Sequence, residues 1–184
     1  MYTDSKSQFF CVFLALILML APARAIMAQA IPVEVVELED GGWQLLRGGK
    51  PYFIQGAGGS ASKEALAEAG GNTFRTWGVG PDLGEQLDEA HRLGLAVVVG
   101  HWLGHERHGF DYDDLDAVSE QFERVRNDVL AYKDHPALLM WAIGNEVEGF
   151  EEGDSPAIWS HVQALAAMVK DLWSASQKPD HILG

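Results

Sequence analysis

The sequence of 184 residues is almost free of cysteine, because Cys11 is the only one and it lies in an apolar stretch near the N-terminus. Disulfides, thiolate zinc sites and a nucleophilic cysteine are therefore excluded from the rest of the chain. Positive charge is also scarce, with 13 Lys and Arg against 27 Asp and Glu and a formal net charge of -14. This acidity opposes binding to nucleic acid or to an anionic membrane surface. A neutral ligand suits it better.

Long apolar runs are absent except at residues 9–20, which follow Lys6. This run is shorter than the roughly 20 residues that a transmembrane helix needs, and it is typical of a secretory signal peptide. An A-x-A cleavage site follows at residues 28–30, with residues 23–25 as the alternative. We therefore expect residues 1–30 to be a signal peptide and the mature protein to be secreted or periplasmic, without a membrane partner. An uncleaved N-terminal anchor is the competing interpretation.

The remaining sequence alternates between short apolar runs and amphipathic segments. Two short strands around Asp40-Gly41 predict a β-hairpin over residues 31–50. Further strands are expected at 52–55, 72–77, 95–100 and 137–143, and helices at 62–69, 82–94, 114–132 and from 155 onward. Asp82 with Glu85 predicts a capping box, and Leu115 is expected on a buried helix face.

Regular strand–helix alternation predicts an α/β fold with parallel strands and right-handed crossovers. Four such units correspond to half of a (β/α)8 TIM barrel, which needs about 250 residues. We therefore expect residues 51–184 to form a TIM-barrel domain truncated to about its first four βα units.

One predicted strand ends in an unusual way. The uncharged run 137–143 stops abruptly at Gly144-Asn145-Glu146. In α/β barrels and open parallel sheets, chemistry lies at such carboxyl ends of strands, so a site is expected here. An ordinary polar turn after a buried strand is the alternative.

The pattern Trp141-x-x-Gly144-Asn145-Glu146 resembles the fourth-strand motif of retaining glycoside hydrolases with a (β/α)8 barrel. It is most similar to the catalytic domain of glycoside hydrolase family 2, the β-galactosidase/β-glucuronidase family, whose entry hairpin matches residues 49–53. The resemblance covers residues 42–180. It implies hydrolysis of O-glycosyl bonds in a carbohydrate substrate, with Glu146 as general acid/base and Asn145 contacting the sugar 2-hydroxyl.

The resemblance also implies roles at the ends of the second and third strands. Arg75 would hold the carboxylate of the nucleophile, and His101 would contact the sugar. Trp77 and Trp102 offer flat apolar faces to sugar rings, whereas Trp141 is expected in the core. A structural salt bridge is the alternative for Arg75.

The family's nucleophile is a Glu on a seventh strand, which this sequence does not contain. Glu148, Glu151 and Glu152 follow the same strand as Glu146 and are expected to be solvated. We therefore expect an inactive fragment of a glycosidase that lacks its nucleophile. A non-catalytic carbohydrate-binding remnant is the alternative.

Three other patterns compete weakly with this interpretation. His101, His105, Glu106 and His108 do not have the His-Glu-x-x-His zinc spacing, and the Asp residues at 111–116 lack the calcium-loop spacing, so no metal is expected. Residues 56–61 match the G-x-G-x-x-A dinucleotide fingerprint, which would indicate a nucleotide-dependent oxidoreductase. No acidic residue for a ribose follows the next strand, so no cofactor is expected.

Overall fold

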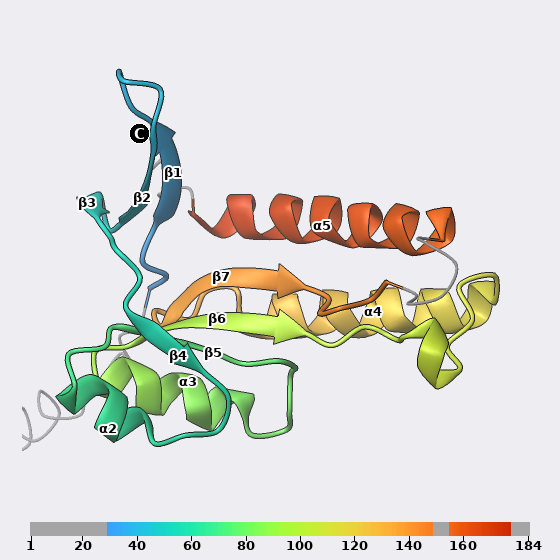
Figure 1. Cartoon of the computed structure of the whole chain (residues 1–184), viewed down its shortest axis with the longest axis horizontal. Coiled ribbons are helices and arrows are strands. Elements are labelled where there is room, and N and C mark those ends of the chain that lie inside the picture. The colour runs from blue at the N-terminus through green and yellow to red at the C-terminus, as the bar shows by residue number, and fades with distance from the viewer. Residues whose placement is uncertain (1–28, 149–154, 178–184) are drawn as a thin grey trace, which may run out of the picture.

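The computed structural model describes residues 29–148 and 155–177. The predicted signal peptide up to residue 28, the carboxylates of Glu151 and Glu152, and the last residues of the chain lie outside this part. Within it, two sheets are present (Figure 1). The first is antiparallel and joins β1 (Val33–Glu37), β2 (Trp43–Arg47) and β3 (Lys50–Pro51).

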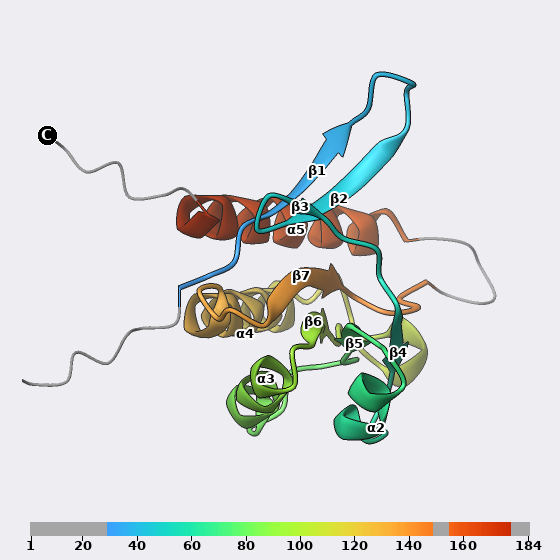
Figure 2. The ribbon, with the colours of Figure 1, turned by 90° about the vertical axis from the view of Figure 1, so that its left-hand side faces the viewer.

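The second sheet is parallel, and its strands are neighbours in chain order, as the alternating pattern predicted. Its elements are β4 (Gly56–Gly58), α2 (Lys63–Glu68), β5 (Thr73–Arg75), α3 (Leu83–Arg92), β6 (Ala96–His101), the 3-10 helix η2 (Glu106–His108), α4 (Leu115–Tyr132), β7 (Leu138–Ile143) and α5 (Pro156–Gln177). Figure 2 looks along the strands and shows them as a curved arc with α2 to α5 around its convex side. The α/β prediction is confirmed, and closure into a (β/α)8 barrel stays a prediction.

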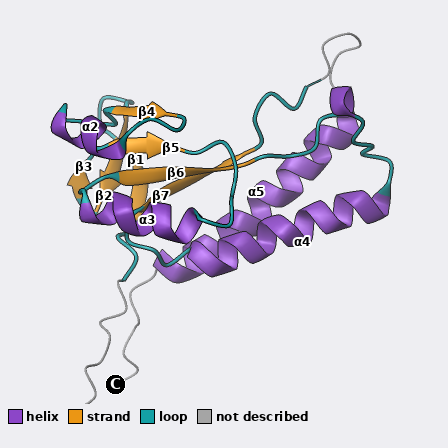
Figure 3. Cartoon of the chain, turned by 90° about the horizontal axis from the view of Figure 1, so that it is seen from below, coloured by secondary structure: helices purple, strands orange, loops and turns teal. Residues whose placement is uncertain are grey.

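The core lies between this sheet and its helices, in two clusters. One cluster joins β5, β6 and α3, with Phe74, Leu87 and Val97 among its buried members. The other joins α4 and α5, which lie side by side in Figure 3. Trp141 of β7 packs against both clusters, as expected for a core residue. Each fully buried Leu or Val side chain stabilises the fold by about 1.5–3 kcal/mol.

The hairpin sheet is tied to the amino-terminal ends of the parallel strands by two side chains. Arg47 Nη2 donates to the carbonyl oxygen of Pro136 at 2.7 Å, just before β7. The Tyr52 hydroxyl donates to the Asn72 carbonyl oxygen at 2.7 Å and lies 2.9 Å from Thr73 Oγ1. The hairpin thus leaves the opposite, carboxyl ends of the strands open. No helix in the described part of the chain is long and apolar enough to cross a membrane.

Several local expectations differ from the structure. Residues 52–55 form no strand, because the sheet partner of β5 is Gly56–Gly58. Asp82 precedes α3 but makes no capping bond to the backbone; its carboxylate instead accepts a hydrogen bond from Gln86 Nε2 at 2.9 Å. Leu115 is 77% exposed because it is the first residue of α4, before the helix reaches its packed neighbours.

The structure also contradicts the dinucleotide interpretation of residues 56–61. Gly56 and Gly58 belong to strand β4 instead of a turn that opens directly into a helix. Gly56 is required because a Cβ there would collide with the carbonyl oxygen of Thr73 on the next strand. Helix α2 begins only at Lys63, and the hydroxyl of Ser62 caps its N-terminus by accepting from Ala65 N.

Candidate functional site

The polar residues after β7 are held by an unusual backbone. Gly144 has φ 82°, and its N–H donates to the carbonyl oxygen of His101 at 3.0 Å, which fixes the exit of β7 against the end of β6. Glu146 has φ 49° and is the only described residue other than glycine with a positive φ. Such conformations cost of order 1–3 kcal/mol in non-glycine residues and are concentrated at functional sites.

Arg75 and Asn145 meet across two strands. Arg75 ends β5, Asn145 follows β7, and Arg75 Nη2 donates to Asn145 Oδ1 at 3.3 Å. The guanidinium also lies over the ring of Trp77, with its Cζ 4.2 Å from the ring centroid. The partner of Arg75 among the described residues is thus an amide oxygen, where a nucleophile's carboxylate or a structural salt bridge was expected.

Glu146 faces a cation that the sequence did not single out. Arg107 Nη2 of η2 lies 3.7 Å from Glu146 Oε2, and the two side chains are 23% and 71% exposed. An exposed pair of this kind contributes little to stability, about 0–1 kcal/mol. Its consequence is positional, because it brings the loop after β6 over the carboxylate that follows β7.

That loop is held in place by a buried hydrogen-bond network. Gly104 N donates to Gln121 Oε1 of α4 at 2.6 Å, and the Tyr112 hydroxyl donates to the Gly104 carbonyl oxygen at 2.7 Å. A Cβ at Gly104 would collide with the ring of Phe110, so glycine is required there. These contacts decide where Arg107 lies, and no motif in the sequence predicted them.

Three rings stack on the same loop. The ring centroids of Trp102 and His105 are 4.9 Å apart, and those of His105 and His108 are 5.3 Å apart. His105 is 2% exposed, and burial, together with the positive charge of Arg107, lowers the pKa of its imidazole. No three His, Cys, Asp or Glu side chains in the described part of the chain are grouped so as to hold a metal ion.

His101 lies elsewhere than a sugar contact requires. Its side chain is completely buried, stacks on Trp141 with centroids 5.1 Å apart, and faces α4, where Nδ1 is 3.7 Å from Asp128 Oδ2. Burial, with the charge of Arg124 as a smaller cause, lowers the pKa of His101 to about 4. The imidazole is therefore neutral at pH 7, and its contact with Asp128 is not an ion pair. Because its side chain is buried, His101 is not a residue of the proposed site.

Trp77 and Trp102 are 45% and 44% exposed, so both offer ring surface to a ligand. Arg75 and Trp77 line a cavity of about 290 Å³ together with β4 and Val98. A larger cavity of about 920 Å³ lies between α2 and α3 and also includes Trp77, and neither Asn145 nor Glu146 lines either cavity. Of the residues predicted for the site, Arg75 and Trp77 line the smaller cavity, whereas Trp77 alone lines the larger one.

Comparison with solved structures found similar chains. Two structures of β-glucuronidase from Ruminococcus gnavus, one in complex with a C6-substituted uronic isofagomine, align with TM-scores of 0.52 and 0.50 at 16% and 14% identity. Each alignment covers 77% of this chain and 26% of the β-glucuronidase. An exo-chitosanase from Amycolatopsis orientalis aligns with a TM-score of 0.49 and 22% identity, over 78% of this chain and 18% of that one.

No protein-family model and no curated protein matches the chain. The chain spans about a quarter of the β-glucuronidase chains that it resembles, 26% of each. At such identities the likeness shows the fold alone. That fold is glycosidase-like.

Proposed function

We propose that this chain carries the acid/base half of a retaining glycoside hydrolase site of the family 2 type, acting on O-glycosyl bonds of a carbohydrate. The observation that carries the proposal is the meeting of Arg75 and Asn145, 3.3 Å apart, beside Glu146 at the carboxyl ends of parallel strands. Three strand-end residues that the resemblance names are thereby brought to one place. The glycosidase-like fold agrees with this proposal, but a fold by itself does not establish an activity.

In this proposal Glu146 protonates the glycosidic oxygen as the bond breaks and then deprotonates the attacking water. Asn145 binds the sugar 2-hydroxyl, and Arg75 orients the Asn145 amide by donating to its oxygen. Glu146 Oε2 faces Arg107, but the side chain is 71% exposed, so a glycosidic oxygen can reach the carboxyl group from solvent. Trp77 or Trp102 packs against a sugar ring.

A retaining site needs a second carboxylate about 5–5.5 Å from the first. Glu146 lies against the cation Arg107 and not against a second carboxylate, and Glu148 follows on the same loop. We therefore propose that the nucleophile comes from outside the residues that the structure describes, and that these 184 residues alone do not turn over a glycoside with retention.

Azide provides the test, because it can take the place of a missing carboxylate nucleophile. The chain is incubated with p-nitrophenyl and 2,4-dinitrophenyl glycosides, with and without azide. Attack on the anomeric carbon breaks the bond to the phenol oxygen, Glu146 supplies the proton, and the product is a glycosyl azide of inverted configuration. Glu146→Gln should slow the p-nitrophenyl substrate by about 10²- to 10⁴-fold and the dinitrophenyl substrate much less, because the better leaving group needs little protonation.

Glu148→Gln is the matched control and should leave both rates unchanged. Equal losses for the two substrates in Glu146→Gln would remove Glu146 from the acid role. The second candidate function is a non-catalytic carbohydrate-binding module, favoured by the 71% exposure of Glu146 and by its pairing with Arg107. Binding of a glycoside without any azide-dependent product would select that candidate.

A further inference from the structure

The groove between α2 and α3 is a concave feature that no step above uses. It encloses about 920 Å³, within the range of about 300–1,000 Å³ typical of small-molecule sites. The groove exists because α2 has 6 residues and α3 has 10, so α2 leaves the first turns of α3 uncovered. The segment that faces those turns, Gly59-Ser60-Ala61, carries only small side chains.

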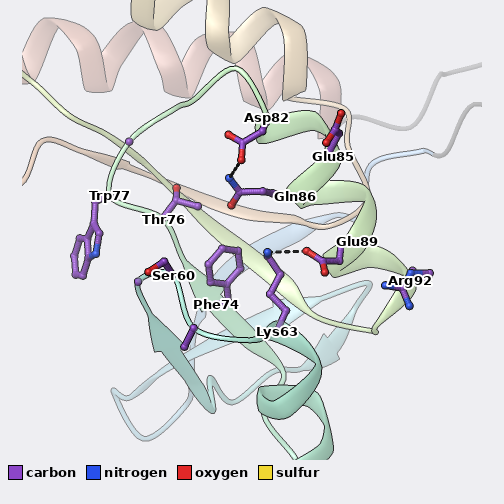
Figure 4. A pocket seen from close by; sticks show the side chains of 13 residues that line it. Ser60, Lys63, Phe74, Thr76, Trp77, Asp82, Glu85, Gln86, Glu89 and Arg92 are labelled. Atoms are coloured by element: carbon purple, nitrogen blue, oxygen red, sulfur yellow. Dashed lines mark hydrogen bonds and ion pairs between the residues drawn. The ribbon is translucent and has the colours of Figure 1, made fainter.

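The floor of the groove is apolar and its walls are polar (Figure 4). Phe74 forms the floor, with Lys63 Nζ 5.2 Å from its ring centroid, and Trp77 stands at one end. Phe74 is 5% exposed, so the apolar surface that a ligand can reach is mainly the ring of Trp77, which is 45% exposed and has hydrogen-bonding groups beside it. An amphipathic ring needs this combination of an apolar face and hydrogen-bonding groups.

The polar wall comes mainly from one face of α3. Asp82, Gln86 and Glu89 are spaced four and three residues apart, so they lie in one row along the helix. Two hydrogen bonds hold the side chains of this row in place. Lys63 Nζ donates to Glu89 Oε2 at 2.7 Å, and Gln86 Nε2 donates to Asp82 Oδ2 at 2.9 Å. Within the described part of the chain, the hydroxyl of Ser60 and the amide oxygen of Gln86 have no hydrogen-bond partner and can bind a ligand.

The charges in the groove nearly balance. Three carboxylates, Asp82, Glu85 and Glu89, stand against the two cations Lys63 and Arg92. A phosphate or a nucleotide would meet the excess of carboxylates, so a strongly anionic ligand is disfavoured. Closely spaced donors and acceptors without a dominant charge match the neighbouring hydroxyls of a neutral ligand.

We infer that this groove binds a neutral pyranose sugar, as a second carbohydrate site next to the strand-end site. Trp77 joins the two, because it lines both this groove and the 290 Å³ cavity that contains Arg75. The nature of the ligand rests on the proposed carbohydrate function, whereas the groove itself does not. A sugar chain long enough to pass over Trp77 would occupy both sites.

Titration of the ¹⁵N-labelled chain with cellobiose, maltose, lactose and N,N′-diacetylchitobiose, followed by amide chemical shifts, tests the inference. At least one of them should shift the amides of Ser60 and Gln86. Ser60→Ala and Gln86→Met each remove one hydrogen bond and should weaken binding by about threefold to tenfold. Glu68→Gln, an exposed change on α2 outside the groove, is the matched control and should bind like the wild type. Both groove variants keep helix-compatible or loop-compatible side chains, and circular dichroism melting checks their folding.

A disaccharide whose affinity falls with Asn145→Ala but not with Ser60→Ala or Gln86→Met would overturn the groove site and leave the strand-end proposal intact. The absence of any shift at the groove for all four sugars would also overturn it, while the azide assay would judge the proposed function separately. Loss of affinity in the groove variants together with normal azide-dependent turnover would support both.

Discussion

Replacing His101 with phenylalanine tests whether burial or the nearby carboxylate of Asp128 determines the pKa of the His101 imidazole. The His101 side chain is 0% exposed, and neither ring nitrogen has a hydrogen-bond partner among the described residues. Phenylalanine can keep the stacking on Trp141 and removes the two buried ring nitrogens that lack a partner. Above pH 7 the variant should therefore be as stable as the wild type or more stable.

Below pH 7 the two proteins should diverge. His101 has a pKa of about 4 in the folded protein, against the ordinary 6.5. Between these values the unfolded chain binds a proton that the folded chain does not, so the folded state loses stability as the pH falls. At about 1.4 kcal/mol per pH unit, the loss approaches roughly 3 kcal/mol at pH 4 and does not increase much below it. Above pH 6.5 the imidazole is neutral in both states and the term vanishes.

Urea unfolding followed by far-ultraviolet circular dichroism, between pH 7 and pH 4, measures this difference. The wild type should lose roughly 3 kcal/mol more than His101→Phe over this range, and Asp128→Asn should keep most of the wild-type dependence, since burial is the main cause. If His101 were instead a protonated partner of Asp128, its pKa would be raised, and acidification from pH 8 to 6 would stabilise the wild type relative to His101→Phe. That sign, or parallel curves, would refute the reasoning.

Three further predictions concern the strand ends and the N-terminus. Arg75→Lys keeps the charge but loses the fork that reaches Asn145 at 3.3 Å, so azide-dependent turnover should fall about tenfold or more with little change in melting temperature; unchanged turnover would contradict the role of Arg75. Gly144→Ala forces a Cβ onto φ 82° and should lower the free energy of unfolding by about 1–2 kcal/mol in urea titrations, and an unaffected midpoint would show that the turn is not strained. We also propose export through residues 9–20, for which mass spectrometry of exported protein should find an N-terminus at Ile31; exported chains that begin at Met1 would argue against cleavage.

The long elements could be predicted from the sequence, because their patterns depend on burial alone. The segment 114–132 shows apolar residues three and four apart, and α4 spans Leu115–Tyr132. The run 137–143 carries no charge, and β7 spans Leu138–Ile143. The short elements could not be predicted in this way. Strand β4 is Gly-Ala-Gly and has no apolar pattern, so only its pairing with Thr73–Arg75 defines it.

The contacts of the candidate site were also only partly predictable from the sequence. The approach of Arg75 and Asn145 follows from parallel strands whose carboxyl ends lie at one edge of the sheet, and the sequence contains that information. The approach of Arg107 to Glu146 does not follow from any local pattern. It depends on where Gln121 of α4 and the Tyr112 hydroxyl hold Gly104, and thus on packing between segments distant in the chain.

His101 faces the helices and not the concave side of the sheet, and this follows from the alternation of side chains along β6. Paired residues of neighbouring parallel strands face the same side, and Phe74, which packs on the helices, pairs with Val97. Val99 and His101 share the parity of Val97 and therefore also face the helices. The position of β6 nearest the strand end that faces the concave side is Gly100, where a Cβ would press on the backbone of residues 76 and 77. Strand β6 thus gives the concave side no functional side chain, and groups from this part of the chain can reach Glu146 only from the loop that follows, as Arg107 does.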